Sequence, residues 1–397
     1  MKVLIVSFYY SPELGAAPSR ITNMAEGLRQ AGYEVEVLTC LPNYPKGRIF
    51  EGYRRCFSRH ETLNGVRVHR YWTYATVTKK PLLRMLSMFS FSFTLWAFAL
   101  KRKRIKSYDR VIVQSPPILV ACSAIMLFRK LYRRKVVLNV SDLWPQSAVE
   151  LGAVREGSLY HRVLAWMERF IYRHADAFQC QSREIKTHVQ GFWPQKPAFL
   201  YRNLQHAVPV ARNRAKRRAK PFRIVYAGLL GVAQDVLAIV EQIDFKRLGA
   251  ELHLFGGGNQ AERISRFVGS HDTGVTYHGY LAKEKMVEEL QRYDASIVPL
   301  MVQIKGAVPS KIFDLLPVGV PILLCGGGEA AEIVRTYGLG YVSAPGDYDA
   351  LRENIRRIAG LTDEAYGRLR DNLLKASEED FSFQVQMQRY AEYLHSL

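Results

Sequence analysis

Residues 309–322 combine side chains that suit phosphate with one that suits sugar hydroxyls. Pro309, Ser310 and Lys311 open a predicted helix, and Asp314 lies one turn further on. The start of a helix presents free backbone N–H groups and the positive end of the helix dipole, and both favour phosphate. Lys311 adds a positive charge, and the Asp314 carboxylate can accept hydrogen bonds from sugar hydroxyls. Phosphate and ribose bound at one place indicate a nucleotide.

Two segments of the first half place candidate side chains directly after predicted strands. Residues 9–18 join the first strand to the first helix, and small residues around Gly15 let a ligand approach the backbone closely. The segment lacks the G-x-G-x-x-G pattern, which argues against a dinucleotide, and a plain tight turn is the alternative. Asp142 and Trp144 follow a later strand, where an acid beside an aromatic ring suits acid–base chemistry or sugar binding. The alternative for Asp142 is the N-cap of a helix.

Glycine-rich turns follow three predicted strands of the second half. Gly228 and Gly231 lie in a strand–loop–helix segment that is the counterpart of residues 9–18. Residues 256–258 and 326–328 are runs of three glycines. Exposed glycine N–H groups ahead of a helix can hold a diphosphate. Flexibility, or an ordinary strand–helix–strand unit, explains the same glycines without a ligand.

Alternating strands and helices predict an α/β protein with two Rossmann-like, doubly wound parallel sheets. The expected strands are residues 3–8, 35–40, 66–71, 111–114, 135–140, 177–180, 222–226, 251–255, 275–277, 295–299 and 321–324. Residues 41–65 are expected to be a long loop. Two such halves in tandem would face each other across a cleft lined by the carboxyl ends of their strands.

A polar, basic stretch with little apolar periodicity marks the domain boundary. We predict a first domain over residues 1–203, a basic linker over 204–221 and a second domain over 222–375. Residues 376–397 are expected to form a helix that packs back on the first domain. A chain of 397 residues can fill two such domains with sizeable cores.

The net charge of +20 is unusual, and three runs hold 16 of the 56 basic residues: 101–106, 129–135 and 212–220. Such clusters indicate an anionic partner surface, either nucleic acid or anionic lipid. Solvated faces and a charged linker are the alternative.

Residues 82–100 favour lipid over nucleic acid. They carry one charge, Arg84, which forms a narrow polar stripe with Ser87, Ser90 and Thr94 at helical spacing, between Lys79–Lys80 and the 101–104 run. The length fits a membrane span, but the stripe and the α/β pattern on both sides favour a helix partly buried in the domain and partly lying in a membrane surface. An ordinary core helix is the alternative.

Cysteine usage and the N-terminus indicate a compartment. Five scattered cysteines without metal spacing are typical of reduced thiols in a cytosolic protein. Residues 2–8 are too short for a signal peptide. We therefore expect a cytoplasmic protein, bound peripherally to the inner face of the membrane.

With these loops in order, the chain resembles glycosyltransferase family 4, of the GT-B fold, along essentially its whole length. It is most similar to the branch that builds bacterial O-antigen, capsule and colanic-acid-type polysaccharides, including the fucosamine transferases. The segments that carry the resemblance are residues 9–13 with Gly15, then 42–45, 142–145 and 309–313.

The resemblance implies a nucleotide-sugar donor, a UDP-sugar, bound mostly by the second domain through Gly15, Gly228, Gly231, Tyr280, Pro309, Ser310, Lys311 and Asp314. Asp314 stands where the family has a ribose-binding glutamate, and Gly306 stands at the family's other glutamate position. Val232 replaces the family's basic residue after the glycine loop, which leaves Lys311 and Lys305 to neutralise the diphosphate. These departures leave open an altered donor or a low activity.

The resemblance also implies transfer with retention of anomeric configuration, without a metal or other cofactor. The donor's own phosphate oxygen would help to take the acceptor proton, with Asp142 orienting the acceptor hydroxyl or acting as base. Tyr10, Tyr44 and Trp144 would form aromatic walls for the acceptor, a saccharide on polyprenyl pyrophosphate. The first domain would then face acceptor and membrane, with no role for nucleic acid.

Two other functions stay open at this point. A GT-B-type nucleotide-sugar epimerase would need acids and histidines converging on the sugar, and the ten scattered histidines form no such cluster in the sequence. A basic protein that binds membrane or polyanions without catalysis would fit the charge and Gly306, and would show steep salt dependence with no preference for UDP.

Overall fold

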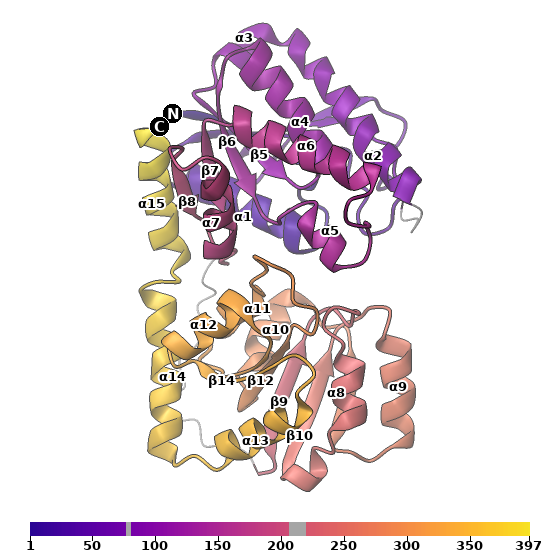
Figure 1. Ribbon diagram of the computed structural model, residues 1–397, viewed down its shortest axis with the longest axis vertical. Coiled ribbons are helices and arrows are strands. Elements are labelled where there is room, and N and C mark those ends of the chain that lie inside the picture. The colour runs from indigo at the N-terminus through magenta and orange to yellow at the C-terminus, as the bar shows by residue number, and fades with distance from the viewer. Residues whose placement is uncertain (77–80, 206–219) are drawn as a thin grey trace. The chain divides into compact units, whose positions relative to one another are not determined.

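The structure is a computed structural model that describes residues 1–76, 81–205 and 220–397, without the side chains of Pro81, Leu82, Arg84, Lys283 and Glu284. The chain divides into an N-terminal unit, Met1–Asn203 with Gln384–Leu397, and a C-terminal unit, Leu204–Phe383. Each unit is built on one largely parallel sheet with helices packed against it (Figure 1), which confirms the predicted pair of Rossmann-like α/β domains. Residues 206–219, which are most of the predicted linker and of its basic run, and Lys79–Lys80 lie outside the described residues.

The N-terminal unit holds an eight-stranded sheet in the order β3-β4-β2-β1-β5-β6-β7-β8. Its strands are β1 (Lys2–Val6), β2 (Glu34–Cys40), β3 (Ser58–Leu63), β4 (Val66–Tyr71), β5 (Arg110–Ser115), β6 (Lys135–Val140), β7 (Ala177–Cys180) and β8 (Ala198–Leu200). The central strands are apolar on both faces because helices cover both sides of a parallel sheet. The expected loop over 41–65 is wrong in part, since it contains β3, which pairs antiparallel with β4.

The helices of this unit are α1 (Ala16–Gln30), α2 (Pro81–Thr94), the 3-10 turn η1 (Leu95–Leu100), α3 (Arg102–Lys106), α4 (Ile118–Ile125), the π-turn η2 (Met126–Leu131), α5 (Gln146–Glu150), α6 (Leu159–His174), α7 (Arg183–Phe192) and α15 (Phe383–Ser396). Helix α4 packs against both α2 and α6 (Figure 1). None of the helices among the described residues is both long and apolar enough to cross a bilayer.

The C-terminal unit holds six parallel strands in the order β11-β10-β9-β12-β13-β14. They are β9 (Phe222–Ala227), β10 (Ala250–Phe255), β11 (Val275–Gly279), β12 (Ala295–Pro299), β13 (Ile322–Cys325) and β14 (Gly340–Ser343). The helical segments are α8 (Val236–Gln242), η3 (Lys246–Leu248), α9 (Ala261–Ser270), α10 (Lys283–Leu290), α11 (Lys311–Leu315), α12 (Gly328–Thr336), α13 (Tyr348–Ala359) and α14 (Asp363–Glu378).

The end of the chain returns to the N-terminal unit through α15. Tyr390 donates a hydrogen bond to the Gln179 side chain at 2.5 Å, and the Gln386 amide group bonds both backbone groups of Arg202. Residues 376–397 are not one helix, however, because α14 ends at Glu378 in the C-terminal unit and α15 begins at Phe383.

Candidate functional site

Lys311 lies against a loop glycine at the carboxyl edge of the C-terminal sheet. A Cβ built on Gly228 would fall 2.3 Å from Lys311 Cε and 2.4 Å from Nζ, so the glycine leaves the room that the lysine fills. Lys311 Nζ also lies 5.3 Å from the centre of the Tyr226 ring. Burial lowers the pKa of Lys311, and the nearby Asp314 carboxylate raises it. A partly dehydrated cation beside a glycine loop is suited to a phosphate group.

The loop that carries Gly228 is hydrogen-bonded to residues 255–260, which contain the glycine run 256–258. Three backbone hydrogen bonds join them: Gly228 N–H to Phe255 C=O at 2.9 Å, Leu230 N–H to Gly257 C=O at 2.9 Å and Gln260 N–H to Leu230 C=O at 3.1 Å. A Cβ on Gly256 would fall 1.8 Å from the Gly228 carbonyl oxygen, and a Cβ on Gly258 would fall 2.3 Å from that of Leu230. These glycines therefore allow close approach of two backbones, not the flexibility that the sequence left open.

Four other predicted donor residues, Gly231, Tyr280, Pro309 and Ser310, lie in loops of the same unit, whereas Gly15 belongs to the N-terminal unit. Pro309 and Ser310 precede α11, which has only five residues, so the helix that we expected to open at Pro309 begins at Lys311 and is short. The Lys311 side chain, rather than a long helix dipole, is then the main positive charge at this point. Gly231 closes the loop that begins at Gly228. Tyr280 is exposed in the loop after β11. The end of β11 is joined to the loop after β10 by a 2.7 Å hydrogen bond from Gly256 N–H to Gly279 C=O.

Asp142 stands directly after β6 in the N-terminal unit and is exposed to solvent. Helix α5 begins at Gln146 with Pro145 at its N-cap, so the alternative that Asp142 caps a helix is wrong. Partial desolvation by surrounding protein raises the pKa of its carboxyl group, and the positive charge of Arg20 lowers it. An open carboxylate at a strand end, near a fixed cation, can orient a hydroxyl group or take its proton.

Arg20 is a site residue that the sequence reasoning missed. It lies on α1 with its side chain buried, and its Nε finds no hydrogen-bond partner among the described residues. Burial lowers the pKa of its guanidinium group, and the Asp142 charge opposes that shift. Its burial could have been predicted from its position four residues before Met24, which places both residues on the buried face of α1. A lone helical arginine is otherwise typical of a solvated surface.

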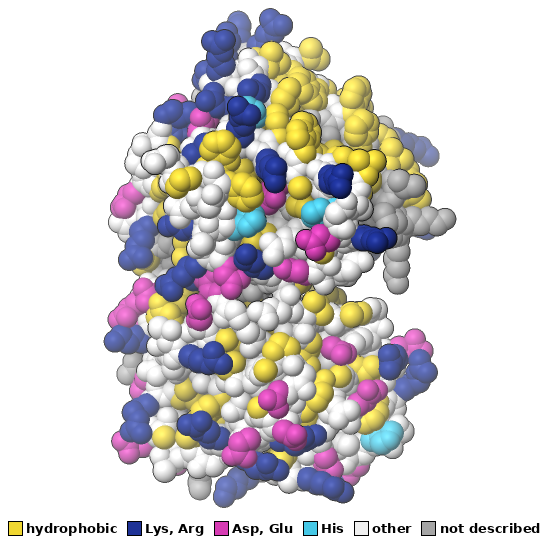
Figure 2. Space-filling model, viewed as in Figure 1, with side chains coloured by type: hydrophobic (Ala, Val, Ile, Leu, Met, Phe, Trp, Pro, Cys, Tyr) yellow, Lys and Arg dark blue, Asp and Glu magenta, His cyan; other side chains and the backbone are white. Residues whose placement is uncertain are grey.

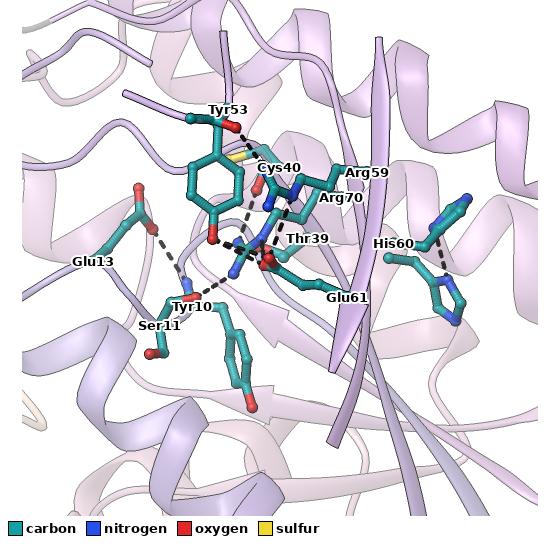
Figure 3. Close-up of polar contacts among 12 residues, drawn as sticks. Tyr10, Ser11, Glu13, Thr39, Cys40, Tyr53, Arg59, His60, Glu61 and Arg70 are labelled. Carbon is teal, nitrogen blue, oxygen red and sulfur yellow. Dashed lines mark hydrogen bonds and ion pairs between the residues drawn. The ribbon is translucent and has the colours of Figure 1, made fainter. Parts of the chain in front are cut away.

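Glu13 ties the loop after β1 to the loop after β2. Its carboxylate accepts hydrogen bonds from the backbone N–H groups of Asn43 at 2.8 Å, Tyr44 at 2.9 Å and Tyr10 at 3.2 Å. Burial raises the pKa of Glu13, and these three N–H groups lower it. Figure 3 shows the Glu13 carboxylate directed at the Tyr10 backbone. Glu13 thus has a structural role in holding two loops at the sheet edge.

A buried arginine, Arg70, also holds the loop after β1 in place. Arg70 on β4 donates to the carbonyl oxygen of Ser11, to that of Cys40 at 3.3 Å, and to the Glu61 carboxylate at 2.6 Å. Tyr53 also donates to Glu61, and its ring lies 5.4 Å from the Arg70 guanidinium carbon. Figure 3 shows the Arg70, Tyr53 and Glu61 side chains converging on one another, with Arg70 bonded to Ser11. Strand β3, which the sequence did not predict, therefore supplies part of the support for the site.

The aromatic residues predicted for the acceptor differ in exposure. Tyr10 is 1% exposed, so it does not fit the predicted role of an aromatic wall. Tyr44 is 44% exposed, and its ring packs edge-on to Tyr9 with centres 5.5 Å apart. Trp144 is partly buried against the core. Gly15 lies beside Tyr44, because a Cβ on Gly15 would fall 3.1 Å from the tyrosine Cε1.

The cysteines and potential metal ligands are scattered. All five cysteines are free thiols. In residues 1–76, 81–205 and 220–397, no three His, Cys, Asp or Glu side chains are grouped so that they could hold a metal ion.

Two family models match successive parts of this chain. Residues 15–202 match a glycosyl transferase 4-like domain, and residues 221–360 match the glycosyl transferases group 1. The first match contains Gly15 and Asp142, and the second contains Gly228 and Lys311.

Full-length relatives and solved structures are similar to the whole chain. A putative colanic acid biosynthesis glycosyl transferase, WcaI of Escherichia coli strain K12, is 26% identical over 387 residues, covering 90% of this chain and 92% of that protein. Among solved structures, sucrose-phosphate synthase from Thermosynechococcus elongatus has a TM-score of 0.72 at 17% identity, covering 100% of this chain and 99% of that one. HepE from Anabaena, solved in complex with UDP, has a TM-score of 0.71 at 14% identity, with full coverage of both chains.

Proposed function

Because the chain belongs to glycosyltransferase family 4 and has the GT-B fold, we propose that it moves a sugar from a UDP-sugar to a lipid-linked saccharide during synthesis of a bacterial surface polysaccharide. The acceptor is carried on polyprenyl pyrophosphate at the inner face of the cytoplasmic membrane. The contact of Lys311 with Gly228 is the observation that carries the proposal. The name of the WcaI relative supports the pathway class, and the UDP complex of HepE supports the nucleotide.

The donor diphosphate is assigned to the loop at Gly228 and to Lys311. Burial around Lys311 weakens the competition from water, so a charge-assisted hydrogen bond to phosphate is stronger there than on an open surface. The backbone pairing with residues 256–258 keeps the loop rigid, which lowers the entropic cost of binding. Asp314 is assigned to the ribose hydroxyls, one turn along the same short helix as Lys311.

Transfer proceeds with retention and without a metal ion. The bond from the sugar C1 to the diphosphate oxygen breaks, and a bond from C1 to the acceptor oxygen forms on the same face of the ring. The acceptor proton passes to the departing phosphate oxygen. Asp142 orients the acceptor hydroxyl, and Arg20 favours the ionised form of this carboxyl group. The protein contributes positioning and stabilisation of the leaving group, since no covalent intermediate is formed.

Binding and product analysis test this function. The full chain should show a higher melting temperature with UDP than with ADP or GDP, because a ligand that binds only the folded state stabilises it. Incubation with UDP-sugars and membrane extract from a polysaccharide-producing bacterium should give a longer lipid-linked saccharide with the donor's anomeric configuration. Equal stabilisation by all polyanions, with no transfer, would favour the non-catalytic alternative. Conversion of the nucleotide sugar to its epimer without an acceptor would favour an epimerase.

A further inference from the structure

Ser87, Ser90 and Thr94 of the polar stripe on α2 face the protein interior. Ser90 accepts a hydrogen bond from the backbone N–H of Tyr74 at 2.8 Å, and Thr94 donates to the carbonyl oxygen of Trp72 at 2.7 Å. Both backbone partners belong to the segment that follows β4. The stripe therefore anchors α2 to the unit, and the opposite, apolar side of the helix faces outward.

The outward side of α2 and η1 is a row of exposed apolar residues at alternating spacings of three and four: Leu86, Phe89, Phe93, Trp96 and Leu100. Phe93 is 73% exposed and Leu100 is 86% exposed. A surface helix normally buries its apolar side and exposes its polar side. Helix α2 and η1 bury Phe91 and Leu95 beside the polar stripe, yet they also expose this second row of apolar residues, so the exposed side needs an apolar partner.

The apolar row continues across α4 to α6. Trp96 Nε1 donates to Ser123 of α4 at 2.8 Å, and Trp166 of α6 stacks on Phe170 with ring centres 5.8 Å apart. We call the surface the α2/α4/α6 face, defined by Leu86, Phe89, Phe93, Trp96, Leu100, Met126, Leu159, Val163 and Trp166, all exposed. Figure 2 shows hydrophobic side chains gathered on this side of the N-terminal unit, with lysines and arginines beside them.

The charges on this face are of one sign. Residues 81–106 and 118–131 contain no aspartate or glutamate. The only acid of α6, Glu168, is buried and lies 3.2 Å from His188. Exposed cations border the apolar residues: Arg102 and Lys103 after η1, Lys130 in η2, and Arg162, Arg169 and Arg173 along α6.

We propose that the α2/α4/α6 face is a membrane-docking surface, with Phe and Trp side chains at the boundary of headgroups and acyl chains and the bordering cations on anionic lipid phosphates. Aromatic residues favour that boundary, and each cation near an anionic leaflet strengthens binding. A second copy of the chain is a poor occupant, because a symmetric contact would bring the same cations together. The proposal rests on the proposed membrane location of the acceptor, but it concerns a surface remote in the sequence from the donor residues.

Vesicle binding by the full chain tests the proposal without donor or acceptor. Sedimentation with vesicles of phosphatidylglycerol and phosphatidylcholine should capture the protein, and vesicles of phosphatidylcholine alone should not. Phe89→Ser with Phe93→Ser should weaken capture by about tenfold or more, because two exposed rings no longer enter the bilayer. Arg162→Glu with Arg169→Glu should also abolish it at moderate salt. Phe192→Ser, an exposed phenylalanine on α7, is the matched control and should bind like the wild type.

The melting temperature shift with UDP is measured for each variant, so that folding and donor binding are judged separately from lipid binding. Retained UDP stabilisation with lost vesicle capture supports the docking surface. Capture that is unchanged in the Phe89/Phe93 variant overturns it. So does a dimer in solution that this variant dissociates, since a second copy would then cover the face. Vesicle capture without any UDP response would instead leave the docking surface standing and reject the proposed donor.

Discussion

The two units differ in where they expose large apolar side chains. In the described part of the C-terminal unit, three such residues are exposed, Leu229, Val232 and Tyr280, and all lie in loops at the carboxyl edge of the sheet. The described part of the N-terminal unit exposes 18, and nine of these lie on α2, η1 and α6. The C-terminal unit thus presents apolar surface only where we place a small ligand, whereas the N-terminal unit presents it along whole helices.

The outer helices differ in charge in the same way. In the C-terminal unit, α9, α13 and α14 carry ion pairs within one turn: Arg266 with Glu262, Arg356 with Glu353 and Arg368 with Glu364. Such pairs are typical of helices that face water. On the α2/α4/α6 face, Arg162, Arg169 and Arg173 of α6 make no ion pair with any residue that the structure describes. This difference is what we expect if the N-terminal unit docks on a membrane surface and the C-terminal unit binds a donor diphosphate, as proposed above.

Among these substitutions, Asp142→Asn should have the largest effect, and it should act on turnover without acting on UDP binding. We expect turnover to fall by about 10²–10⁴-fold, the range for loss of a group that handles a proton in the transition state. Affinity for UDP should not change, because Gly228, Lys311 and Asp314, to which we assign the donor, lie in the other unit. Initial rates with saturating donor, together with calorimetry of UDP binding, measure both quantities. A variant that turns over like the wild type would remove Asp142 from the chemistry.

Lys311→Ala should have the converse effect. We expect UDP affinity to fall by about 1.5–3 kcal/mol, the usual value of a hydrogen bond to a charged group. Vesicle binding should stay the same, since the α2/α4/α6 face belongs to the N-terminal unit. Lys375→Ala removes an exposed lysine from α14 and serves as the control for loss of charge alone. Equal UDP affinity of the two variants would contradict the donor site.

The strands that carry the site were predictable because their apolar residues are local signals. The strands over residues 3–8, 135–140 and 222–226 were predicted close to their observed bounds. Strand β3 was not, because Ser58–Leu63 is polar and lies at the edge of the sheet. Its position depends on pairing with β4, so no short window of sequence contains enough information to identify it.

The site residues show the same limit. The sequence indicated Asp142 and Lys311, since each lies next to a strand or helix end with few other roles available. It did not indicate Arg20, because the acid whose charge acts on it, Asp142, is more than a hundred residues away in the sequence. Likewise, the stripe on α2 was visible, but its inward direction depends on the backbone of residues 72–74. Local patterns identify candidates, and tertiary contacts decide which way they face.

Gly256→Ala should damage the C-terminal unit alone. The added methyl group would overlap the Gly228 carbonyl oxygen, and the positive φ of 139° disfavours alanine. We expect a loss of about 1–3 kcal/mol in unfolding free energy, with weaker UDP binding as the Gly228 loop shifts. Gly257→Ala is the neighbouring control, because its Cβ would meet no atom within 4 Å. Denaturant unfolding should therefore show that Gly256→Ala is less stable than Gly257→Ala. Equal stabilities would refute the close contact between Gly256 and the Gly228 carbonyl group.

A chain of hydrogen bonds in the N-terminal unit depends on two neutral histidines. His69 Nε2 lies 2.8 Å from the Glu36 carboxylate, His69 Nδ1 lies 3.1 Å from His60 Nδ1, and His60 Nε2 lies 2.9 Å from Lys101 Nζ. Lys101 can only donate, so His60 accepts at Nε2 and donates from Nδ1, and His69 donates from Nε2. Burial lowers the pKa of both histidines, and the charge of Lys101 acts in the same direction. Protonation of either ring would place two N–H groups face to face.

The smallest expected effect follows from that chain. Since the folded-state pKa of His69 is depressed, the unfolded chain takes up the proton first, and stability is lost as the pH falls below the ordinary histidine pKa of about 6.5. Between about pH 7.5 and 5.5 we expect the melting temperature of the N-terminal unit to fall by a few degrees. His69→Gln keeps a donor for Glu36 but does not titrate, so its decrease should be smaller. Hydrogen exchange at β2 and β4 would assign the loss to this unit, and an equal pH response in the variant would show that other groups cause it.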